Sequence, residues 1–459
     1  MNQSSTEIPQ LKSAAQFGGC YVQVVPFGDW VVASRIGGLQ VFADQKQLTP
    51  VDECALTVIP DLQEEQGVLF AVCRTKTFMV FIDAQGRIVL KQTNRRVWNI
   101  NRHQKSELNS PFGRFVLDKP TGTIETPSGR RLKLPGYSRP AWVSCHATKG
   151  IVYVADVGRI HRLVLRNNDW QLEGGFECDG WPKDVACVSD NVFVANVFGV
   201  SWYKEQTEYP YLRLQDRLSR FHFRAAKVSA NETNVFVCDE ARGVHMFSTK
   251  NGRLTVCGGV FVDGGGWDFL PIGKSGYLAS GAGGWRWYEN FEDLISGSIT
   301  KTEFHAPTSK ERIQGVKTWS FLDSVVVMSS NTCRIFRSHT DAILFDYACN
   351  AWSGVAIGEH FVVATESGLL LLAWNEDKCR IDLVDHAQFE EARDVCWDGQ
   401  LLWVASGRQG IRCFALNNDD HSLCFVGCFP VCGFSRGIFR TKDRIYVGAG
   451  DGGLVVIKM

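Results

Sequence analysis

The stretch 401–416, LLWVASGRQGIRCFAL, decides the fold. An apolar run ends in a small residue, a polar turn closed by Gly410 follows, and a second apolar run completes the stretch. This pattern is typical of two antiparallel strands joined by a hairpin. The flanking segments 392–398 and 421–428 each predict one more short strand. Four short antiparallel strands make one blade of a β-propeller.

The same pattern recurs along the whole chain at intervals of about 40 residues, the length of a four-stranded blade. A small or apolar residue ends the second strand of each unit and marks its position. The eleven markers are Ala33, Ala71, Leu117, Ala155, Ala195, Cys238, Ala279, Met328, Ala364, Ala405 and Gly448. The sequence therefore predicts an all-β β-propeller of about eleven four-stranded units.

The predicted third strands are continuously apolar, as in GLLLL from Gly368 and GLVVI from Gly453. Continuous apolar strands fit a sheet that is covered on both faces, as a blade is by its neighbours. The runs are short and lack the 3.6-residue period of a helix, so a helical interpretation is excluded.

The last unit ends at Met459, directly after its third strand, and needs a fourth strand from elsewhere. Residues 10–19, QLKSAAQFGG, resemble the fourth strands that begin near Gln171 and Ser422. We predict that the N-terminal segment 1–19 pairs with the last blade and closes the array. Closure would remove the exposed edge of an open sheet array.

Residues 20–136 are predicted to form divergent blades and residues 137–459 regular ones. Eleven blades exceed the usual four to eight of one ring, so the chain forms either one large ring or two intertwined rings. The insertions 204–221 and 290–315 are the candidate ring boundaries, and each is either a lid or a linker.

Three segments carry a family resemblance: DVACVSDNVFVANVFGVSWYK from Asp184, DVCWDGQLLWVASGRQGIRCFAL from Asp394, and GIFRTKDRIYVGAGDGGLVVIKM from Gly437. They resemble LVIVD-type propeller repeats, with an inner strand, a YVAD-like strand and a GL-apolar strand in succession. The resemblance covers about residues 137–459. The chain departs from the pattern because Phe, Tyr or Lys replaces the Asp that follows the third strand. The resemblance implies a propeller that binds partners without catalysis.

Composition limits the kinds of partner and the cellular location that we expect. The chain has 49 basic and 49 acidic residues and a pI of about 7.1, which argues against a nucleic acid or an anionic membrane as partner. There is no secretory signal pattern and no apolar run of about 18 residues, so we expect a cytoplasmic protein. Most of the 16 cysteines lie in predicted strands, and we interpret them as free thiols of a reducing compartment.

We find no catalytic or metal-binding motif. Cys424, Cys428 and Cys432 are spaced four apart, and on a strand such residues lie about 13 Å from each other, too far to share one ion. The histidines show no ligand spacing, and no nucleophile or phosphate-binding motif is present. We therefore expect no cofactor and no metal.

Charged and aromatic residues recur where the first strand of each unit begins, about eleven residues before its marker. In a propeller these entries surround one mouth of the central channel. The candidate binding residues are Lys183, Asp184, Arg224, Trp267, Asp268, Trp352, Arg393, Asp394 and Arg436. Such a ring suits an acidic peptide, a carboxylate ligand or a phosphate. The alternative is that each basic residue pairs with a neighbouring Asp and simply ties the blades together.

These features suggest two main functions for the protein. The first is a non-enzymatic scaffold or assembly subunit that binds a protein partner through one rim or the channel mouth, with loop aromatics such as Tyr209, Tyr211 and Phe221 available for contact. The second is a small-ligand-binding or hydrolytic propeller that uses Asp184 and Asp394 at the mouth. A tryptophan-rich rim that binds carbohydrate is a third reading, supported only by the 14 tryptophans.

Overall fold

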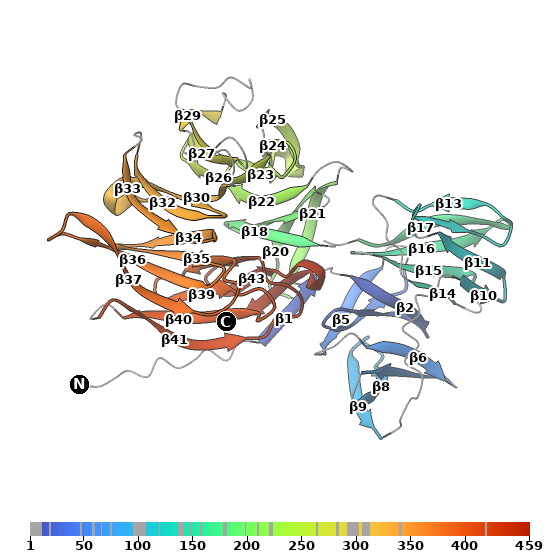
Figure 1. The fold of residues 1–459 in the computed structure, drawn as a ribbon. Coiled ribbons are helices and arrows are strands. Elements are labelled where there is room, and N and C mark those ends of the chain that lie inside the picture. The colour runs from blue at the N-terminus through green and yellow to red at the C-terminus, as the bar shows by residue number, and fades with distance from the viewer. Residues whose placement is uncertain are drawn as a thin grey trace.

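The computed structural model describes most of the chain, and strands dominate it (Figure 1). The described residues are 12–17, 20–45, 48–56, 60–65, 67–73, 76–94, 107–118, 120–135, 142–146, 149–156, 158–177, 181–197, 199–208, 211–219, 224–262, 265–280, 284–291, 303–304, 313–338, 342–417 and 420–459. The helical elements with described bounds are single 3-10 turns, η1 (Lys250–Gly252), η2 (Ser320–Leu322) and η3 (Gly450–Gly452), and Phe291 also has a helical backbone. None of the helical segments in the described residues is long and apolar enough to cross a membrane.

In the described part of the chain, the strands form eleven four-stranded antiparallel sheets. Four of them come from residues 21–133 and 142–177. These contain β2 (Tyr21–Phe27), β3 (Trp30–Arg35), β4 (Gly38–Ala43) and β5 (Thr49–Ala55); β6 (Asp61–Glu65), β7 (Val68–Val72), β8 (Thr77–Ile82) and β9 (Ile88–Thr93); β10 (Glu107–Ser110), β11 (Gly113–Asp118), β12 (Thr123–Glu125) and β13 (Arg131–Lys133); β14 (Trp142–His146), β15 (Ile151–Asp156), β16 (Arg159–Arg166) and β17 (Asp169–Glu177).

The other seven sheets come from residues 182–458 together with the N-terminal strand. Three of them contain β18 (Pro182–Val188), β19 (Asn191–Asn196), β20 (Gly199–Glu205) and β21 (Leu212–Ser219); β22 (Ala225–Ala230), β23 (Asn234–Asp239), β24 (Gly243–Ser248) and β25 (Thr255–Phe261); β26 (Gly266–Ile272), β27 (Ser275–Ser280), β28 (Gly284–Tyr288) and β29 (Glu303–Phe304). Four contain β30 (Ile313–Trp319), β31 (Ser324–Ser329), β32 (Thr332–Arg337) and β33 (Ile343–Ala348); β34 (Ala351–Ile357), β35 (His360–Thr365), β36 (Gly368–Asn375) and β37 (Arg380–Gln388); β38 (Asp394–Trp397), β39 (Leu401–Ala405), β40 (Ile411–Asn417) and β41 (Ser422–Phe429); β42 (Gly437–Arg440), β43 (Arg444–Gly448), β44 (Leu454–Lys458) and β1 (Lys12–Phe17).

The repeat pattern is confirmed at the level of the sheets. Each of the eleven markers lies in the second strand of its sheet, from Ala33 in β3 to Gly448 in β43. The stretch 401–416 forms the hairpin of β39 and β40, and the two flanking segments form β38 and β41. The all-β, propeller-like architecture follows from these units.

The predicted N-terminal pairing is present. β1 runs antiparallel to β44, with Lys12 opposite Lys458 and Phe17 opposite Leu454. The last sheet therefore contains the first and the last strand of the chain. An edge that would otherwise be open along β44 is paired, as expected for edge protection.

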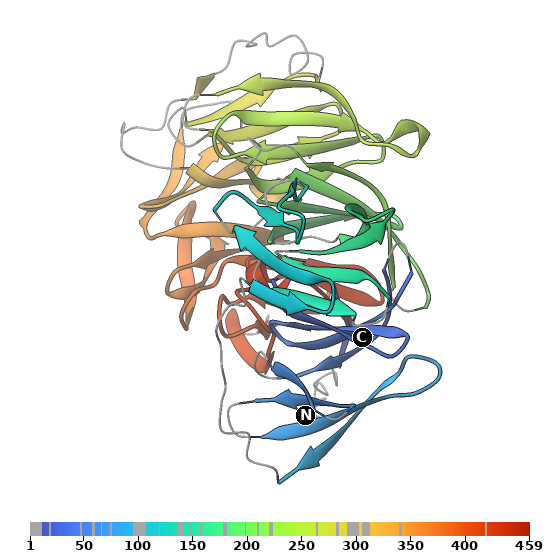
Figure 2. The same cartoon turned by 90° about the vertical axis from the view of Figure 1, so that its right-hand side faces the viewer.

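The first strands of the seven later sheets lie side by side in chain order, β18, β22, β26, β30, β34, β38 and β42, and β42 also lies beside β18. The four earlier sheets follow another order, in which β2 lies between β14 and β6, and β14 also contacts β10. Figure 1 shows the two groups as separate bodies, and Figure 2 shows the four-sheet group in front of the seven-sheet group. The order of neighbours changes between β17 and β18. Of the two predicted ring boundaries, 204–221 lies elsewhere, because it includes the connection between β20 and β21 of one sheet. Most of the other, 290–315, lies outside the described residues.

The apolar third strands are buried on both faces, as predicted. In β36, Leu370 and Leu372 pack with residues of the preceding sheet, whereas Leu369 and Leu371 pack with residues of the following one. All four are at most 1% exposed. Alternate side chains thus fill two separate cores.

The glycine that opens a third strand is required by a close backbone approach. Gly368 has φ +124°, and a Cβ at this position would lie 2.0 Å from the carbonyl oxygen of Ala387. A side chain cannot be accommodated there, which explains the glycine at the start of the GLLLL run.

The cysteines of the described residues are free thiols, in agreement with the sequence interpretation. Cys238, Cys333 and Cys413 are buried, whereas Cys424 and Cys428 are exposed on β41. The side chain of Cys145, like Tyr209 and Phe221, lies outside the described part of the structure.

Candidate functional site

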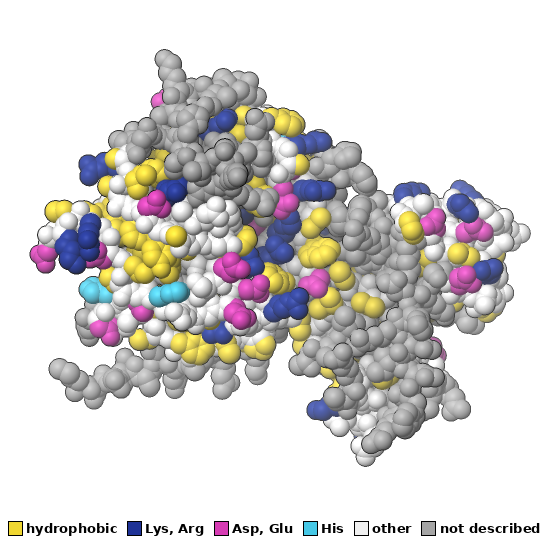
Figure 3. Space-filling model, in the orientation of Figure 1, with side chains coloured by type: hydrophobic (Ala, Val, Ile, Leu, Met, Phe, Trp, Pro, Cys, Tyr) yellow, Lys and Arg dark blue, Asp and Glu magenta, His cyan; other side chains and the backbone are white. Residues whose placement is uncertain are grey.

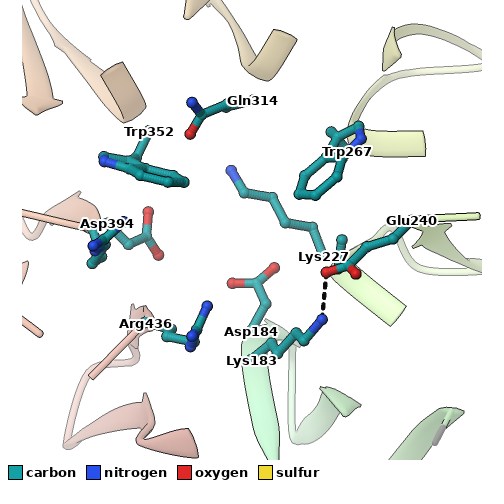
Figure 4. Close-up of a pocket in the computed structure, with 11 residues that line it drawn as sticks. Lys183, Asp184, Lys227, Glu240, Trp267, Gln314, Trp352, Asp394 and Arg436 are labelled. Carbon is teal, nitrogen blue, oxygen red and sulfur yellow. Dashed lines mark hydrogen bonds and ion pairs between the residues drawn. The ribbon is translucent and has the colours of Figure 1, made fainter. Parts of the chain in front are cut away.

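A hollow lies where the first strands of the seven later sheets begin (Figure 4). Each of the seven sheets contributes one residue at the same structural position. These residues are Lys183, Ala226, Trp267, Gln314, Trp352, Arg393 and Arg436, and all line the hollow. We call them the outer layer.

Irregular strand pairing explains why these residues face the hollow. In five sheets the register shifts across the outer-layer residue, for example between Pro182 and Asp184 and between Ala225 and Lys227. A β-bulge leaves one residue unpaired and re-aims its side chain. In the remaining two sheets Arg393 and Arg436 come directly before the first paired residue of their strands.

The next residue along each strand pairs with the marker residue of the second strand. This inner layer consists of Asp184, Lys227, Asp268, Gly315, Ser353, Asp394 and Gly437. Equivalent positions in the seven sheets thus hold three carboxylates, one ammonium group and three small residues.

The three aspartates of the inner layer connect neighbouring sheets. Asp184 Oδ2 accepts the backbone N–H of Val228 at 3.0 Å. Asp268 Oδ2 accepts that of Val316 at 3.1 Å, and Asp394 Oδ2 accepts that of Ile438 at 2.9 Å. Each bond joins a first strand to the first strand of the following sheet, so these side chains stabilise the packing between sheets.

Lys227 places its ammonium group among these carboxylates. Its Nζ lies 3.3 Å from Asp268 Oδ2, and Lys317 Nζ lies 3.9 Å from the same oxygen. Burial opposes ionisation of Asp268, but the two lysines outweigh it and lower the pKa of this carboxyl group. Burial likewise opposes the charge on Lys227, but the carboxylates around it, Asp268 foremost, raise its pKa. Lys227 is therefore a fixed cation.

Asp184 behaves differently. Its side chain is nearly buried, at 9% exposed, and it faces Asp394 across the hollow (Figure 4). Burial first, and the neighbouring charge of Asp394 second, raise the pKa of Asp184 to about 7. This carboxyl group therefore exchanges its proton near neutral pH.

The outer-layer cations have different partners. Lys183 forms an ion pair with Glu240 (Figure 4), and Arg393 Nη2 lies 3.2 Å from Glu391 Oε1. The guanidinium of Arg393 also stacks over Trp352, 4.2 Å from the ring centre. These contacts hold the Arg393 side chain against the wall of the hollow.

Arg436 has no such carboxylate partner. It lies over the ring of Phe434, 5.1 Å from its centre, and makes no side-chain hydrogen bond or ion pair with the described residues. It is also exposed. Partial burial first, and the neighbouring Arg393 second, lower the pKa of Arg436, whereas Glu240, Glu391 and Asp451 act in the opposite direction. Arg436 thus lies at the opening of the hollow without an ion pair to a described residue.

Gln314 supplies a buried polar group on the opposite side. It is 5% exposed, and its Nε2 donates to Asn350 Oδ1 at 3.0 Å. Its Oε1 has no hydrogen-bond partner in the described part of the structure. Because a buried acceptor without a partner is costly, a ligand with an N–H or O–H donor would be stabilised here.

The hollow has a volume of about 90 Å³, space for several water molecules or for one small polar group of a ligand. Figure 4 shows Lys227 extending between Trp267 and Trp352, with Asp184 and Asp394 below it. Figure 3 shows acidic and basic side chains gathered over the region of β18 and β43. Among the described residues, His, Cys, Asp and Glu form no group of three that could hold a metal ion.

The structure brings together seven of the nine residues selected from the sequence. Asp268 lies behind them and contacts the hollow through Lys227. Arg224 is exposed and does not line the hollow; its backbone carbonyl accepts the N–H of Glu240.

Four lining residues are absent from the sequence selection: Ala226, Lys227, Glu240 and Gln314. Lys227 lies eleven residues before its marker Cys238, as Asp184 lies before Ala195, so a strict count would have identified it instead of Arg224. Glu240 follows the second strand β23, and no repeated feature of the sequence indicates it.

No protein-family model and no curated protein matches this chain. Among solved structures, the chain is similar to the crystal structure of the computationally designed Ika8 protein. The two share 11% sequence identity with a TM-score of 0.46, over 71% of this chain and 98% of the designed one.

Proposed function

We propose that the seven sheets of β1 and β18–β44 are the blades of one closed propeller, and that the four sheets of β2–β17 form a separate array beside it. The circular order of the seven first strands and the pairing of β1 with β44 support this division. It replaces the choice between one eleven-bladed ring and two intertwined rings with a seven-bladed ring and a four-sheet array. The resemblance to LVIVD-type repeats stays a prediction.

We further propose that the protein is a non-enzymatic scaffold that binds a segment of a protein partner at the mouth of this ring. One observation carries the proposal: seven sheets each place one outer-layer side chain around a single hollow. Two tryptophans supply stacking surface, and Arg436 supplies an exposed charge that forms no ion pair with the described residues. Aromatic and arginine side chains around a partly desolvated hollow are typical of binding hot spots.

The test is affinity capture from native cells with the full-length chain and two charge-matched variants. Arg436→Glu reverses the charge at the mouth, whereas Arg253→Glu reverses an exposed charge in the turn between β24 and β25. We expect a stoichiometric protein partner with the wild type and the Arg253 variant, and its loss with the Arg436 variant. Equal recovery with all three proteins would contradict binding at the mouth.

A second candidate is a small-ligand-binding or hydrolytic site that uses Asp184 and Asp394. In its favour, burial and the neighbouring charge of Asp394 raise the pKa of Asp184 to about 7, and a carboxylate with a pKa near neutral pH suits a general base. Hydrolysis of an ester or amide substrate that is lost in both Asp184→Asn and Asp394→Asn would support this candidate over the scaffold.

A further inference from the structure

The balance of charge at the mouth indicates which kind of segment fits. In the outer layer the charged members are all basic: Lys183, Arg393 and Arg436. Glu240 compensates the first and Glu391 the second. A segment that approaches from solvent therefore meets Arg436, the outer-layer cation that forms no ion pair with a described carboxylate, beside the wall formed by Trp352 and Arg393. Glu240, Glu391 and Asp451 act on Arg436 only from a longer distance.

The floor of the hollow adds a second cation. Lys227 Nζ shares Asp268 with Lys317, at 3.3 and 3.9 Å. One carboxylate thus serves two ammonium groups, and the carboxyl groups of Asp394 and Asp184 also act on Lys227 and favour its charge. An anionic group between Arg436 and Lys227 would be met by cations from two sheets.

Asp394 and Asp184 both line the hollow and oppose an anion there, and Asp184 is the more deeply buried of the two. The charged groups that surround Asp184 come from every neighbouring element of the mouth: Lys183 before it in β18, Lys227 of β22, Asp268 of β26, Glu240 after β23, Asp394 of β38, and the guanidinium groups of Arg393 and Arg436 at the starts of β38 and β42. Figure 4 shows its carboxyl group beside Arg436 and opposite Asp394. An incoming carboxylate would lie next to Asp184, and two adjacent carboxylates favour sharing one proton.

We propose that the partner segment inserts an acidic side chain, Glu or Asp, between Arg436 and Lys227, and that Asp184 takes up one proton from solvent as it binds. The inference rests on the proposed docking function and names the chemistry of its partner. The protonated Asp184 donates its O–H to the incoming carboxylate and no longer repels it. Its other oxygen keeps the bond to the N–H of Val228.

A proton taken up on binding makes the affinity depend on pH. With a pKa of about 7, Asp184 is about half protonated in the free protein at pH 7 and about one-tenth protonated at pH 8. We therefore expect uptake of about half a proton at pH 7 and about 0.9 at pH 8, and an affinity about fivefold weaker at pH 8. Below pH 6 the affinity levels off, and near pH 4 it falls because the ligand carboxylates become protonated.

The experiment is calorimetric titration of the full-length protein with Ac-Gly-Glu-Glu-Gly-NH2 at pH 7 and pH 8, each in two buffers of different ionisation enthalpy. Ac-Gly-Gln-Gln-Gly-NH2 is the neutral control, and Ac-Gly-Lys-Lys-Gly-NH2 is the basic control. We expect binding of the acidic peptide alone, with an enthalpy that changes with the buffer. Arg436→Glu should abolish binding, whereas Asp184→Asn should bind with no buffer dependence and with equal affinity at both pH values.

Each other outcome overturns the inference. Binding of the neutral or the basic peptide at least as tightly as the acidic one rejects the acidic partner, and binding without proton uptake rejects the role of Asp184. If the acidic peptide does not bind while Arg436→Glu still loses its captured protein, the docking function stands and the acidic chemistry fails. If neither experiment depends on Arg436, both proposals fail.

Discussion

Replacing Asp184 with Asn tests whether a buried, ionised carboxyl group at the mouth destabilises the folded protein. The amide has nearly the same shape as the carboxyl group, and its oxygen still accepts the N–H of Val228, a bond of 3.0 Å in the wild type. The substitution therefore removes the titrating charge and retains the contact between the first two sheets of the seven-sheet group.

The expected size follows from the shifted pKa. Asp184 titrates near pH 7 in the folded protein, compared with 3.8 in the unfolded chain. The difference is about 3 units, and each unit is worth about 1.4 kcal/mol, so ionised Asp184 destabilises the fold by at most about 4 kcal/mol. Between pH 4 and pH 7 the folded state holds a proton that the unfolded chain has released. Wild-type stability therefore falls as the pH rises through this window and levels off above it.

Urea unfolding, followed by tryptophan fluorescence at pH 5, 6, 7 and 8, measures the effect. We expect Asp184→Asn to be the more stable protein at pH 8, with a difference that shrinks as the pH falls. Asp443→Asn, at an exposed turn position, is the matched control and should follow the wild type. A stability difference that stays constant from pH 5 to pH 8, or a wild type that is the more stable protein at pH 8, would refute the assignment of the shifted proton to Asp184.

Three further substitutions or truncations test the fold. Deleting residues 1–19 removes the partner of β44 and its ladder of hydrogen bonds, and should cost several kcal/mol at about 1 kcal/mol per bond; an unchanged thermal midpoint would exclude the closure. Gly368→Ala should cost more than about 2 kcal/mol because its Cβ would meet the carbonyl of Ala387, whereas Gly358→Ala, which has open space around it, should cost about 1 kcal/mol for its positive φ. Trp319→Phe removes a fully buried indole whose Nε1 donates to the Gly358 carbonyl at 3.0 Å, and should cost about 2 to 4 kcal/mol in urea unfolding.

The sheets were predictable because each unit repeats one local pattern. The markers needed no knowledge of distant contacts: an apolar run, a turn glycine and a second apolar run identify a hairpin wherever they occur. The pairing of β1 with β44 was predictable for a related reason, since a unit that stops after three strands lacks a fourth. The order of the sheets around an axis depends on packing between units, which no local pattern encodes. The change of neighbours between β17 and β18 was therefore not foreseen.

The candidate site was predictable where a site residue lies at a constant spacing before the marker of its sheet. Asp184 and Asp394 lie eleven residues before their markers, and the fold carries both to the same hollow. Gln314 was not identified from the sequence because the turn between β30 and β31 contains η2, which lengthens the spacing between Gln314 and its marker Met328. Glu240 was not identified because its role depends on an ion pair with Lys183, which belongs to another sheet. A side chain that enters a site from a turn has no periodic signal.

The two readings of the mouth charges, ties between blades and a binding surface, are compatible because a carboxylate has two oxygens. In Asp184, Oδ2 accepts a backbone N–H of the next sheet, while the carboxyl group as a whole lines the hollow. Asp184→Ala would remove both the hydrogen bond to the N–H of Val228 and the carboxyl group that lines the hollow. A loss of binding in that variant would therefore not separate a structural role from a role in recognition. Asp184→Asn keeps the acceptor and removes only the exchangeable proton. A structural role alone predicts that this variant binds with the same pH dependence as the wild type, whereas a role in recognition predicts that the dependence disappears.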